Sequence, residues 1–579
     1  MASNLVNLDA IIRREDWNAK PEANIQKPSN ITFRLIEFEQ SGLAFQILRK
    51  PEFQRETSSW EPRKVVDLVK SFLEGDLIPS VIIWKNSETG NLFVIDGAHR
   101  LGALIAWVHN DYGDGHLSRQ FFNDIVPPEQ LKAATDTRKE MDKQVGRYAT
   151  IKESGNLPIS VKEGRYARAL TEPVITQVMG GSVEKAEASF FKINQQGTPI
   201  LPTELRLIES RNKAYGISTR ALVRAGVGHK FWKDFAIEKQ LQIESLSKDV
   251  YSLLFKPPLN SPISVGLDLP IGGRGYSTEA IGLLFAFVNL TICPPAKKLP
   301  RGKRKIVSKG KDNPSIAVTA DDMSGDGTIS ILQDVRNITT RMAGKLPRSL
   351  ALHSAIYFYS ATGRFQPPSF LAVASLIQEL ESEPGNAFFW FTIHRHYFEQ
   401  FIARHRFLVN QTVTKFGGME KSHEPVLDMF RTILLLSSER KTDSEIMQAL
   451  KSKFDYLRDQ TPNEFPASEG DATTAIKNAK IRKEGIEKVH LCHICNSAIH
   501  PNAISMEHKE DLKHGGKSSV ENIGFSHPYC NSDKEALQAI FKNADPEAWR
   551  NVPTPKILCQ QPLTPAPEDA IQKESHEPE

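Results

Sequence analysis

Three cysteines and one histidine near the C-terminal end have the residue types and spacing of a metal site. Cys492 and Cys495 form a Cys-x-x-Cys pair, and His527 and Cys530 form a His-x-x-Cys pair. Two such pairs supply four ligands for one tetrahedral Zn²⁺. Because protein side chains then fill all four coordination positions, the expected zinc is structural rather than catalytic.

Two other histidines, His490 and His500, are alternatives to His527 as the fourth zinc ligand. The surrounding segment of about 60 residues is too short to build a large core. Metal coordination is therefore expected to supply folding free energy directly, so that removal of the zinc unfolds the segment.

The segment between the two pairs has the pattern of two strands followed by a helix. An apolar-leading stretch ends at Glu507-His508, Gly515-Gly516 allows a hairpin turn, and the second metal pair begins a helix. This order resembles the HNH family of nucleases, with its ββα-metal fold, over about residues 485 to 545.

The resemblance to HNH nucleases implies roles for four residues. His508 is implied as the general base, and Glu507 and Asn531 as ligands of a catalytic Mg²⁺ or Mn²⁺ ion. Asn522 is implied to brace the loop between the strands. The residue types suit this chemistry, because a neutral imidazole accepts a proton from water and a hard ion on oxygen ligands neutralises phosphate charge. Glu507 departs from the Asp usual in the family, which leaves the metal preference open.

A second candidate site lies at a strand-to-helix turn in the N-terminal part of the chain. The turn reads Asp96-Gly97-Ala98-His99-Arg100. Asp96 is a natural helix N-cap, and Gly97 permits close approach of the backbone. Free N–H groups at the helix N-terminus, with His99 and Arg100, suit a phosphate. Simple helix capping is the alternative interpretation.

Two motifs accompany this turn, Gln54-Arg55 upstream and Asn194-Gln-Gln-Gly197 downstream, although the second could also be a helix C-cap. With them, residues 30 to 215 resemble the ParB/sulfiredoxin-like nucleotidase domain of modification-dependent (type IV) restriction enzymes. The resemblance implies a site that binds and hydrolyses a nucleoside triphosphate. Its residues would be Gln54, Arg55, Asp96, Gly97, His99, Arg100 and Asn194.

The elements around the N-terminal turn are predicted to form an α/β unit, from apolar periodicity and turn residues. In order, they are a helix opened by Trp60-Glu61-Pro62, strands over 80–84 and 92–95, a charged, exposed helical insertion over 127–155, a strand over 157–161 and a helix over 183–193.

The length of 579 residues exceeds one domain, and the pattern predicts a multidomain α+β protein. The central part is predicted to be mostly helical, most clearly over 348–360, 368–380 and 387–407. The expected divisions are an N-terminal extension (1–29), the ParB/sulfiredoxin-like α/β domain (30–215), a mostly helical domain (216–480), a zinc-stapled ββα-metal HNH domain (481–550) and a disordered tail (551–579).

The net charge of +4 is too small for a pervasive polyanion-binding surface. Residues 297–311 are rich in Lys and Arg without any acid, which predicts a mobile basic loop that is either solvated or in contact with a DNA backbone. The apolar stretches are too short to span a bilayer, and the N-terminus lacks a signal-peptide pattern, so we expect a cytoplasmic protein without membrane partners.

Together these features predict a nucleotide-regulated, metal-dependent DNA endonuclease of a prokaryotic anti-phage restriction system. The expected cofactors are structural Zn²⁺, catalytic Mg²⁺ or Mn²⁺, and a nucleoside triphosphate. The expected partner is phage DNA that bears or lacks a chemical mark. A nucleotide-operated ParB-like DNA-binding adaptor with a purely structural zinc module is the alternative, and an RNA substrate and a homo-oligomer stay open.

Overall fold

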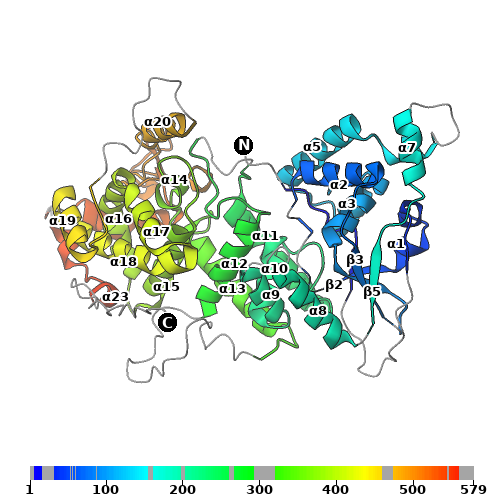
Figure 1. The fold of residues 1–579 in the computed structure, drawn as a ribbon. Coiled ribbons are helices and arrows are strands. Elements are labelled where there is room, and N and C mark those ends of the chain that lie inside the picture. Colours follow the sequence, from blue (N-terminus) through cyan, green and yellow to red (C-terminus); the bar gives the residue numbers. More distant parts are fainter. Residues whose placement is uncertain are drawn as a thin grey trace, which may run out of the picture.

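The computed structural model describes residues 5–15, 31–52, 54, 57–58, 60–86, 88–153, 161–180, 182–196, 202–259, 266–292, 320–459, 474–543, 545 and 547–559. Figure 1 shows an α/β unit in blue and cyan on one side and a helical body in green and yellow on the other. The protein is therefore a multidomain mixture of helices and strands, as expected.

The N-terminal unit contains a mixed five-stranded sheet with the strand order β1-β2-β4-β3-β5. Only the β3–β4 pair is antiparallel, and the other pairs are parallel. The expected strands 80–84 and 92–95 are confirmed as β3 and β4. The bounds are β1 Arg13–Glu15, β2 Leu48–Pro51, β3 Val81–Lys85, β4 Leu92–Asp96 and β5 Thr176–Met179.

Helices cover both faces of this sheet. Successive side chains of a strand point to opposite faces, and β3 carries apolar residues at successive positions, so both faces need a covering layer. Ile83 packs into the core that holds helices α2 (Pro62–Glu74) and α3 (Ala98–His109). The next residue, Trp84, packs in the opposite layer with Phe190 of α8 (Val183–Gln196). The helices expected after Trp60 and over 183–193 are confirmed.

Residues 5–15, expected to belong to an N-terminal extension, are instead part of the sheet and its core. Val6, Leu8 and Ile11 are buried with the helices on one face of the sheet, and β1 pairs in parallel with β2. The sequence does not reveal this strand, because the run of residues is short and its pairing partner, β2, lies far along the chain.

The charged segment 127–155 forms two helices, α5 (Pro128–Gln144) and α6 (Tyr148–Glu153), as expected. It is not wholly exposed, because α5 buries Ala133, Ala134 and Met141. Of the strand expected over 157–161, residues 157–160 lie outside the described residues, and Val161 begins helix α7 (Val161–Ala169) instead.

The helical body begins after α9 (Pro202–Glu209), and the expected mostly helical character is confirmed for its described residues. Its helices share one large apolar core. They are α10 (Ala214–Val223), α11 (Ile237–Phe255), α12 (Thr278–Ile292), α13 (Asp326–Met342), α15 (Pro367–Ser382), α16 (Ala387–Arg404), α17 (Phe407–Phe416), α18 (Met419–Ser438), α19 (Asp443–Lys453) and α20 (Thr474–Ile486).

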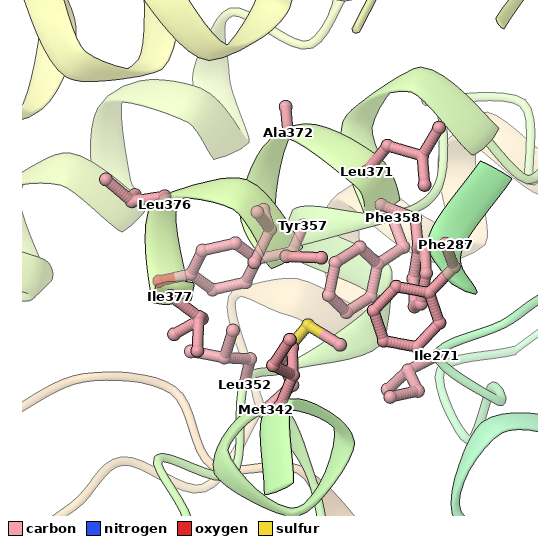
Figure 2. Packing of buried hydrophobic residues seen from close by; sticks show 14 of the residues in the cluster. Ile271, Phe287, Met342, Leu352, Tyr357, Phe358, Leu371, Ala372, Leu376 and Ile377 are labelled. Carbon is pink, nitrogen blue, oxygen red and sulfur yellow. The ribbon is translucent and has the colours of Figure 1, made fainter. Parts of the chain in front are cut away.

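The helices expected over 368–380 and 387–407 are confirmed as α15 and α16, but most of 348–360 is not helical. Only α14 (Ser354–Tyr357) is a helix there. The preceding residues form a turn and then an irregular segment, in which Ala351 has φ 45°. Leu350 and Leu352 of this segment donate backbone hydrogen bonds to carbonyl groups at the end of α13. Figure 2 shows that Leu352 and Tyr357 lie deep in the core of the helical body. Burial on all sides, rather than helical periodicity, explains the apolar residues of this segment.

The basic loop 297–311 and residues 560–579 of the predicted tail lie outside the described residues. The preceding part of the predicted tail is ordered: it contains α23 (Lys556–Cys559), and Leu558 is buried against the helical body. Throughout the described ranges, no helix combines the length and the apolar character needed to cross a membrane.

Candidate nuclease and nucleotide sites

The C-terminal module is a two-stranded hairpin followed by helices. Strand β6 (Ser505–His508) pairs in an antiparallel manner with β7 (Ile523–Ser526), and α21 (Pro528–Ser532) and α22 (Lys534–Phe541) follow directly. The β-β-helix layout expected from the sequence is therefore confirmed. The glycine pair does not form a tight hairpin turn: Gly515, at φ 94°, ends a 3₁₀ turn within a long loop between the strands.

The four predicted zinc ligands lie together in the core of this module. The ligand atoms of Cys492, Cys495, His527 and Cys530 all lie within 4.8 Å of one another, and all four residues are buried. His527 Nδ1 is 3.4 Å from Cys495 Sγ and 3.5 Å from Cys530 Sγ. Three sulfur donors and one imidazole nitrogen at such separations fit a tetrahedral zinc ion.

A second contact orients the imidazole of His527. Its Nε2–H donates to the carbonyl oxygen of Ala498 at 3.1 Å, which leaves Nδ1 as the ligand atom facing the thiols. The alternative ligands are used elsewhere. His500 Nε2 contacts the carbonyl oxygen of Leu269, and the His490 ring packs against Phe525.

The thiols of the cluster influence one another strongly. Burial alone would raise the pKa of Cys492, but hydrogen bonds with Cys495 and Cys530 lower it well below its ordinary value. Burial raises the pKa of Cys530 instead. The cluster thus favours at least one thiolate, which is the form that binds a metal.

The zinc cluster joins the module to the helical body. Cys492, Cys495 and Cys530 share an apolar cluster with Ala351 and Ile393 of that body. Backbone hydrogen bonds run between the same two parts, from His500 N–H to Ala351 O at 3.2 Å and from Tyr529 N–H to Ser349 O at 3.0 Å. The module is therefore supported by more than its own small core.

The two predicted ligands of the catalytic ion lie where β6 contacts the helices that follow the hairpin, with Glu507 on β6 and Asn531 on α21. Asn531 Nδ2 donates to Ser505 Oγ at 3.0 Å, and Glu507 Oε1 is 3.3 Å from Lys534 Nζ. Ser505 and Glu507 are two residues apart on β6, so they share one face. His508 ends the strand, and its Nε2 is 3.0 Å from Ser518 Oγ in the long loop.

The side chain of Asn522 ties together the loop between the strands. Its Oδ1 accepts from the backbone N–H of Glu510 at 2.9 Å. Its Nδ2 donates to the carbonyl oxygens of Glu510 at 2.9 Å and Lys517 at 2.8 Å. These bonds hold the beginning and the end of the loop against each other, next to His508.

Sequence reasoning did not single out Lys534, whose ammonium contacts the carboxylates of Glu507 and Asp511 and the carbonyl oxygen of His508. A signal was present, because Lys534 lies only three residues after Asn531 in the sequence, at the start of the next helix, α22. Which groups it would reach depended on the fold of the hairpin.

The N-terminal turn has a different cap from the expected one. Gly97, at φ 91°, is the N-cap of α3, and the Asp96 carboxylate does not cap the helix. Instead, Asp96 Oδ2 accepts a hydrogen bond of 2.7 Å from Arg100, which also donates to the carbonyl oxygen of Ser80. The Asp96 carboxylate therefore binds Arg100, one turn along the helix, instead of the free backbone N–H groups. Gly97 occupies the cap position because glycine adopts its left-handed backbone conformation easily.

The other predicted nucleotide residues lie around this turn, as far as they are described. Gln54 Nε2 donates to the carbonyl oxygen of Ile95 at 3.4 Å. The His99 ring stacks on Trp60 at a centroid distance of 5.5 Å. Arg55 lies outside the described residues, and of Asn194 only the backbone, in α8, is described.

Among the cavities formed by the described residues, Gln54 and Arg100 line different ones. Arg100 lines a cavity of about 450 Å³ beside α7, together with Arg165 and Arg168. Gln54 lines a cavity of about 80 Å³ whose wall includes Arg224 from the end of α10, at the junction with the helical body.

A buried ionic network holds the backbone near Gln54. Arg14 Nη2 is 2.8 Å from Asp9 Oδ1, and Lys50 also pairs with Asp9, with all three side chains almost completely buried. Burial would raise the pKa of Asp9, but Arg14 and Lys50 lower it well below its ordinary value. Arg14 also donates to the carbonyl oxygen of Glu52, so this network positions the loop that carries Gln54.

Comparisons with known proteins agree with this division of the chain. Residues 34–209 match the family described as the N-terminal domain of GmrSD restriction endonuclease. Residues 492–537 match the HNH endonuclease family. No curated protein and no solved structure is significantly similar to the chain.

A GmrSD N-terminal domain combined with an HNH domain is the architecture of a type IV restriction enzyme. The two matches support a DNA endonuclease that acts in restriction and defence, and the HNH match supports phosphodiester hydrolysis. The HNH match and the Cys/His cluster together suggest zinc and a divalent metal.

Proposed function

We propose that the chain is a nucleotide-regulated, metal-dependent DNA endonuclease that attacks phage DNA according to its chemical modification. The observation that carries the proposal is the buried cluster of Cys492, Cys495, His527 and Cys530, which supports a hairpin and helix bearing Glu507, His508 and Asn531. A zinc module of this shape with an imidazole at the strand end suits phosphodiester hydrolysis.

In this proposal His508 acts on the water that attacks phosphorus. Its imidazole takes a proton from the water, the water oxygen forms a bond to phosphorus, and the bond from phosphorus to the leaving oxygen breaks. Glu507 and Asn531 would hold Mg²⁺ or Mn²⁺, which when bound stabilises negative charge on the phosphate and the leaving group. Asn522 keeps the loop beside His508 in place through the backbone contacts described above.

The test uses the full-length, zinc-loaded chain with modified phage DNA, unmodified plasmid and RNA, each with Mg²⁺ or Mn²⁺ and with or without each nucleoside triphosphate. His508→Ala is expected to lower the cleavage rate by about 10²- to 10⁴-fold, the usual contribution of a general base. Zinc content and melting temperature should not change. His514→Ala, an exposed histidine in the same loop, is the matched control.

Undiminished cleavage by His508→Ala would refute the assignment of the general base. Nucleic-acid binding by the wild-type chain without cleavage under any of these conditions would favour the DNA-binding adaptor instead. Cleavage of RNA alone would replace DNA as the substrate.

We also propose that the N-terminal unit hydrolyses a nucleoside triphosphate at the Asp96 turn and that this activity gates cleavage. The close pair of Asp96 and Arg100 at a helix N-terminus supports the proposal. A phosphate could replace the Asp96 carboxylate as the hydrogen-bond acceptor of Arg100, because both groups are anions. Asp96→Ala is expected to lose turnover, whereas Asp67→Ala on the exposed side of α2 is expected to keep it. No turnover by the wild-type chain with any of the four nucleotides, with or without DNA, would contradict this part.

A further inference from the structure

Lys534 is a buried lysine beside the residues of the proposed nuclease site. Its side chain is only 7% exposed, which is unusual for lysine. Its ammonium contacts the Asp511 carboxylate and the carbonyl oxygen of His508, and lies 3.3 Å from Glu507 Oε1. An ammonium has three N–H donors, so these three acceptors can satisfy all of them.

These contacts join three parts of the module. Lys534 begins α22, Glu507 and His508 end β6, and Asp511 lies in the loop that follows. The ammonium therefore restrains both the carboxylate of Glu507 and the backbone that carries the His508 imidazole. A shift of either group of about 1 Å would be costly for a reaction that depends on orientation.

The positive charge of Lys534 is expected to weaken binding of a divalent ion, although the same residue orients the groups of the site. The ammonium partly neutralises two carboxylates, and its hydrogen bond lowers the pKa of Asp511. The ammonium is 3.3 Å from Glu507 Oε1, so it would repel a divalent ion held by this carboxylate. The place is partly buried, and like charges repel more strongly there than in water. Lys534 thus fixes the position of Glu507 and at the same time lowers the affinity of Glu507 for a divalent ion.

We propose that Lys534 is a positioning residue of the nuclease site that orients Glu507 and His508 for cleavage and weakens binding of the divalent ion. This inference rests on the proposed function. It predicts two effects of opposite sign when the charge is removed, namely slower cleavage and tighter metal binding. A merely structural lysine would not produce that combination, because loss of the local fold would weaken both.

The experiment compares Lys534→Met, which keeps the length of the side chain without its charge, with the wild-type chain. Lys513→Met is the matched control, because Lys513 lies in the same module and pairs with Glu535 at the surface, with side chains 60% and 73% exposed. Both variants lose one positive charge, so the general electrostatic effect is the same. Zinc content and melting temperature verify that each variant is folded.

Binding of Mn²⁺ is measured without DNA by electron paramagnetic resonance, and cleavage is measured separately. Lys534→Met is expected to bind Mn²⁺ on the order of tenfold more tightly and to cleave at least about tenfold more slowly at saturating metal. Lys513→Met is expected to match the wild-type chain in both. If Lys534→Met does not fold, Lys534→Gln keeps an N–H donor for the His508 carbonyl group and should change both quantities in the same directions.

Mn²⁺ binding by the folded variant that is equal to or weaker than wild type would overturn the inference, as would an unchanged cleavage rate. These results would leave the proposed function intact, provided that the wild-type chain binds Mn²⁺ and cleaves. A wild-type chain that neither binds Mn²⁺ nor cleaves nucleic acid would overturn the proposed function and the inference together.

Discussion

Arg395 and Glu399 lie one turn apart on α16, with Arg395 Nη2 2.8 Å from Glu399 Oε1 and side-chain exposures of 0% and 4%. The other carboxylate oxygen of Glu399 accepts the backbone N–H of Ala498 at 3.0 Å, beside the zinc cluster. Arg395 also donates to the carbonyl oxygen of Leu350. One buried ion pair therefore connects the nuclease module with the helical body.

Glu399→Ala is expected to lower the free energy of unfolding of the helical body by about 3–5 kcal/mol, because it leaves Arg395 buried without its counter-charge. Urea denaturation followed by tryptophan fluorescence measures the change. Glu484→Ala is the control, since Glu484 forms an exposed pair with Lys480 on α20 and its loss should cost within about 0.5 kcal/mol. Equal stability of the two variants would contradict the importance of the buried pair.

Removal of the metal from the zinc cluster is expected to destabilise more than the module itself. Cys530→Ser should lose bound zinc, and hydrogen exchange should then become faster both in the hairpin and around Ile393, because these regions share one apolar cluster. Metal analysis and hydrogen exchange provide the measurements. Cys559→Ser, at an exposed cysteine outside the cluster, should retain one zinc per chain. Retention of zinc by Cys530→Ser would be inconsistent with this ligand set.

Asn522→Ala is expected to slow cleavage without releasing zinc. It removes one acceptor and two donor bonds that hold the loop beside His508, and misplacement of about 1 Å can cost about 10²-fold in rate. Hydrogen exchange of residues 509–521 should become faster. Asn502 is an exposed residue of the same module, and Asn502→Ala removes its hydrogen bond to Asp268 of the helical body, which should leave the rate unchanged. A wild-type rate for Asn522→Ala would show that the loop does not need this brace.

His353 should make the helical body less stable in acid. Burial lowers its pKa from 6.5 to about 3, and neither ring nitrogen has a hydrogen-bond partner among the described residues. Between these values the unfolded chain binds a proton that the folded chain does not, so stability falls as pH decreases from about 6.5 to 3. This histidine should contribute a loss of about 2 kcal/mol between pH 8 and pH 5.

His353→Phe, which keeps a ring of similar size, should reduce the acid sensitivity by that amount. The measurement is the free energy of unfolding of both proteins at pH 8 and pH 5. The same pH dependence in both proteins would mean that His353 is protonated equally in the folded and unfolded chains.

Short-range patterns in the sequence were sufficient for several features. The spacing of the cysteines and His527 identified the cluster. Each ligand pair is close in the sequence, so a single contact between the two pairs is enough to form the site. Alternating and periodic apolar residues identified β3, β4 and α2 correctly, since those elements bury one or two faces in a regular manner. Turn and cap chemistry was less secure, and the cap of α3 is Gly97 rather than Asp96.

Contacts between distant residues were decided only by the tertiary structure. Residues 13–15 pair with β2 in the sheet. Lys534 contacts Glu507 and Asp511, and Glu399 accepts a hydrogen bond from Ala498. No local sequence pattern links any of these partners. Composition and spacing report how a segment pairs with its neighbours along the chain. Which buried charge meets which distant acceptor depends on how whole elements pack, because burying a charge is tolerated only where folding brings its partners to it.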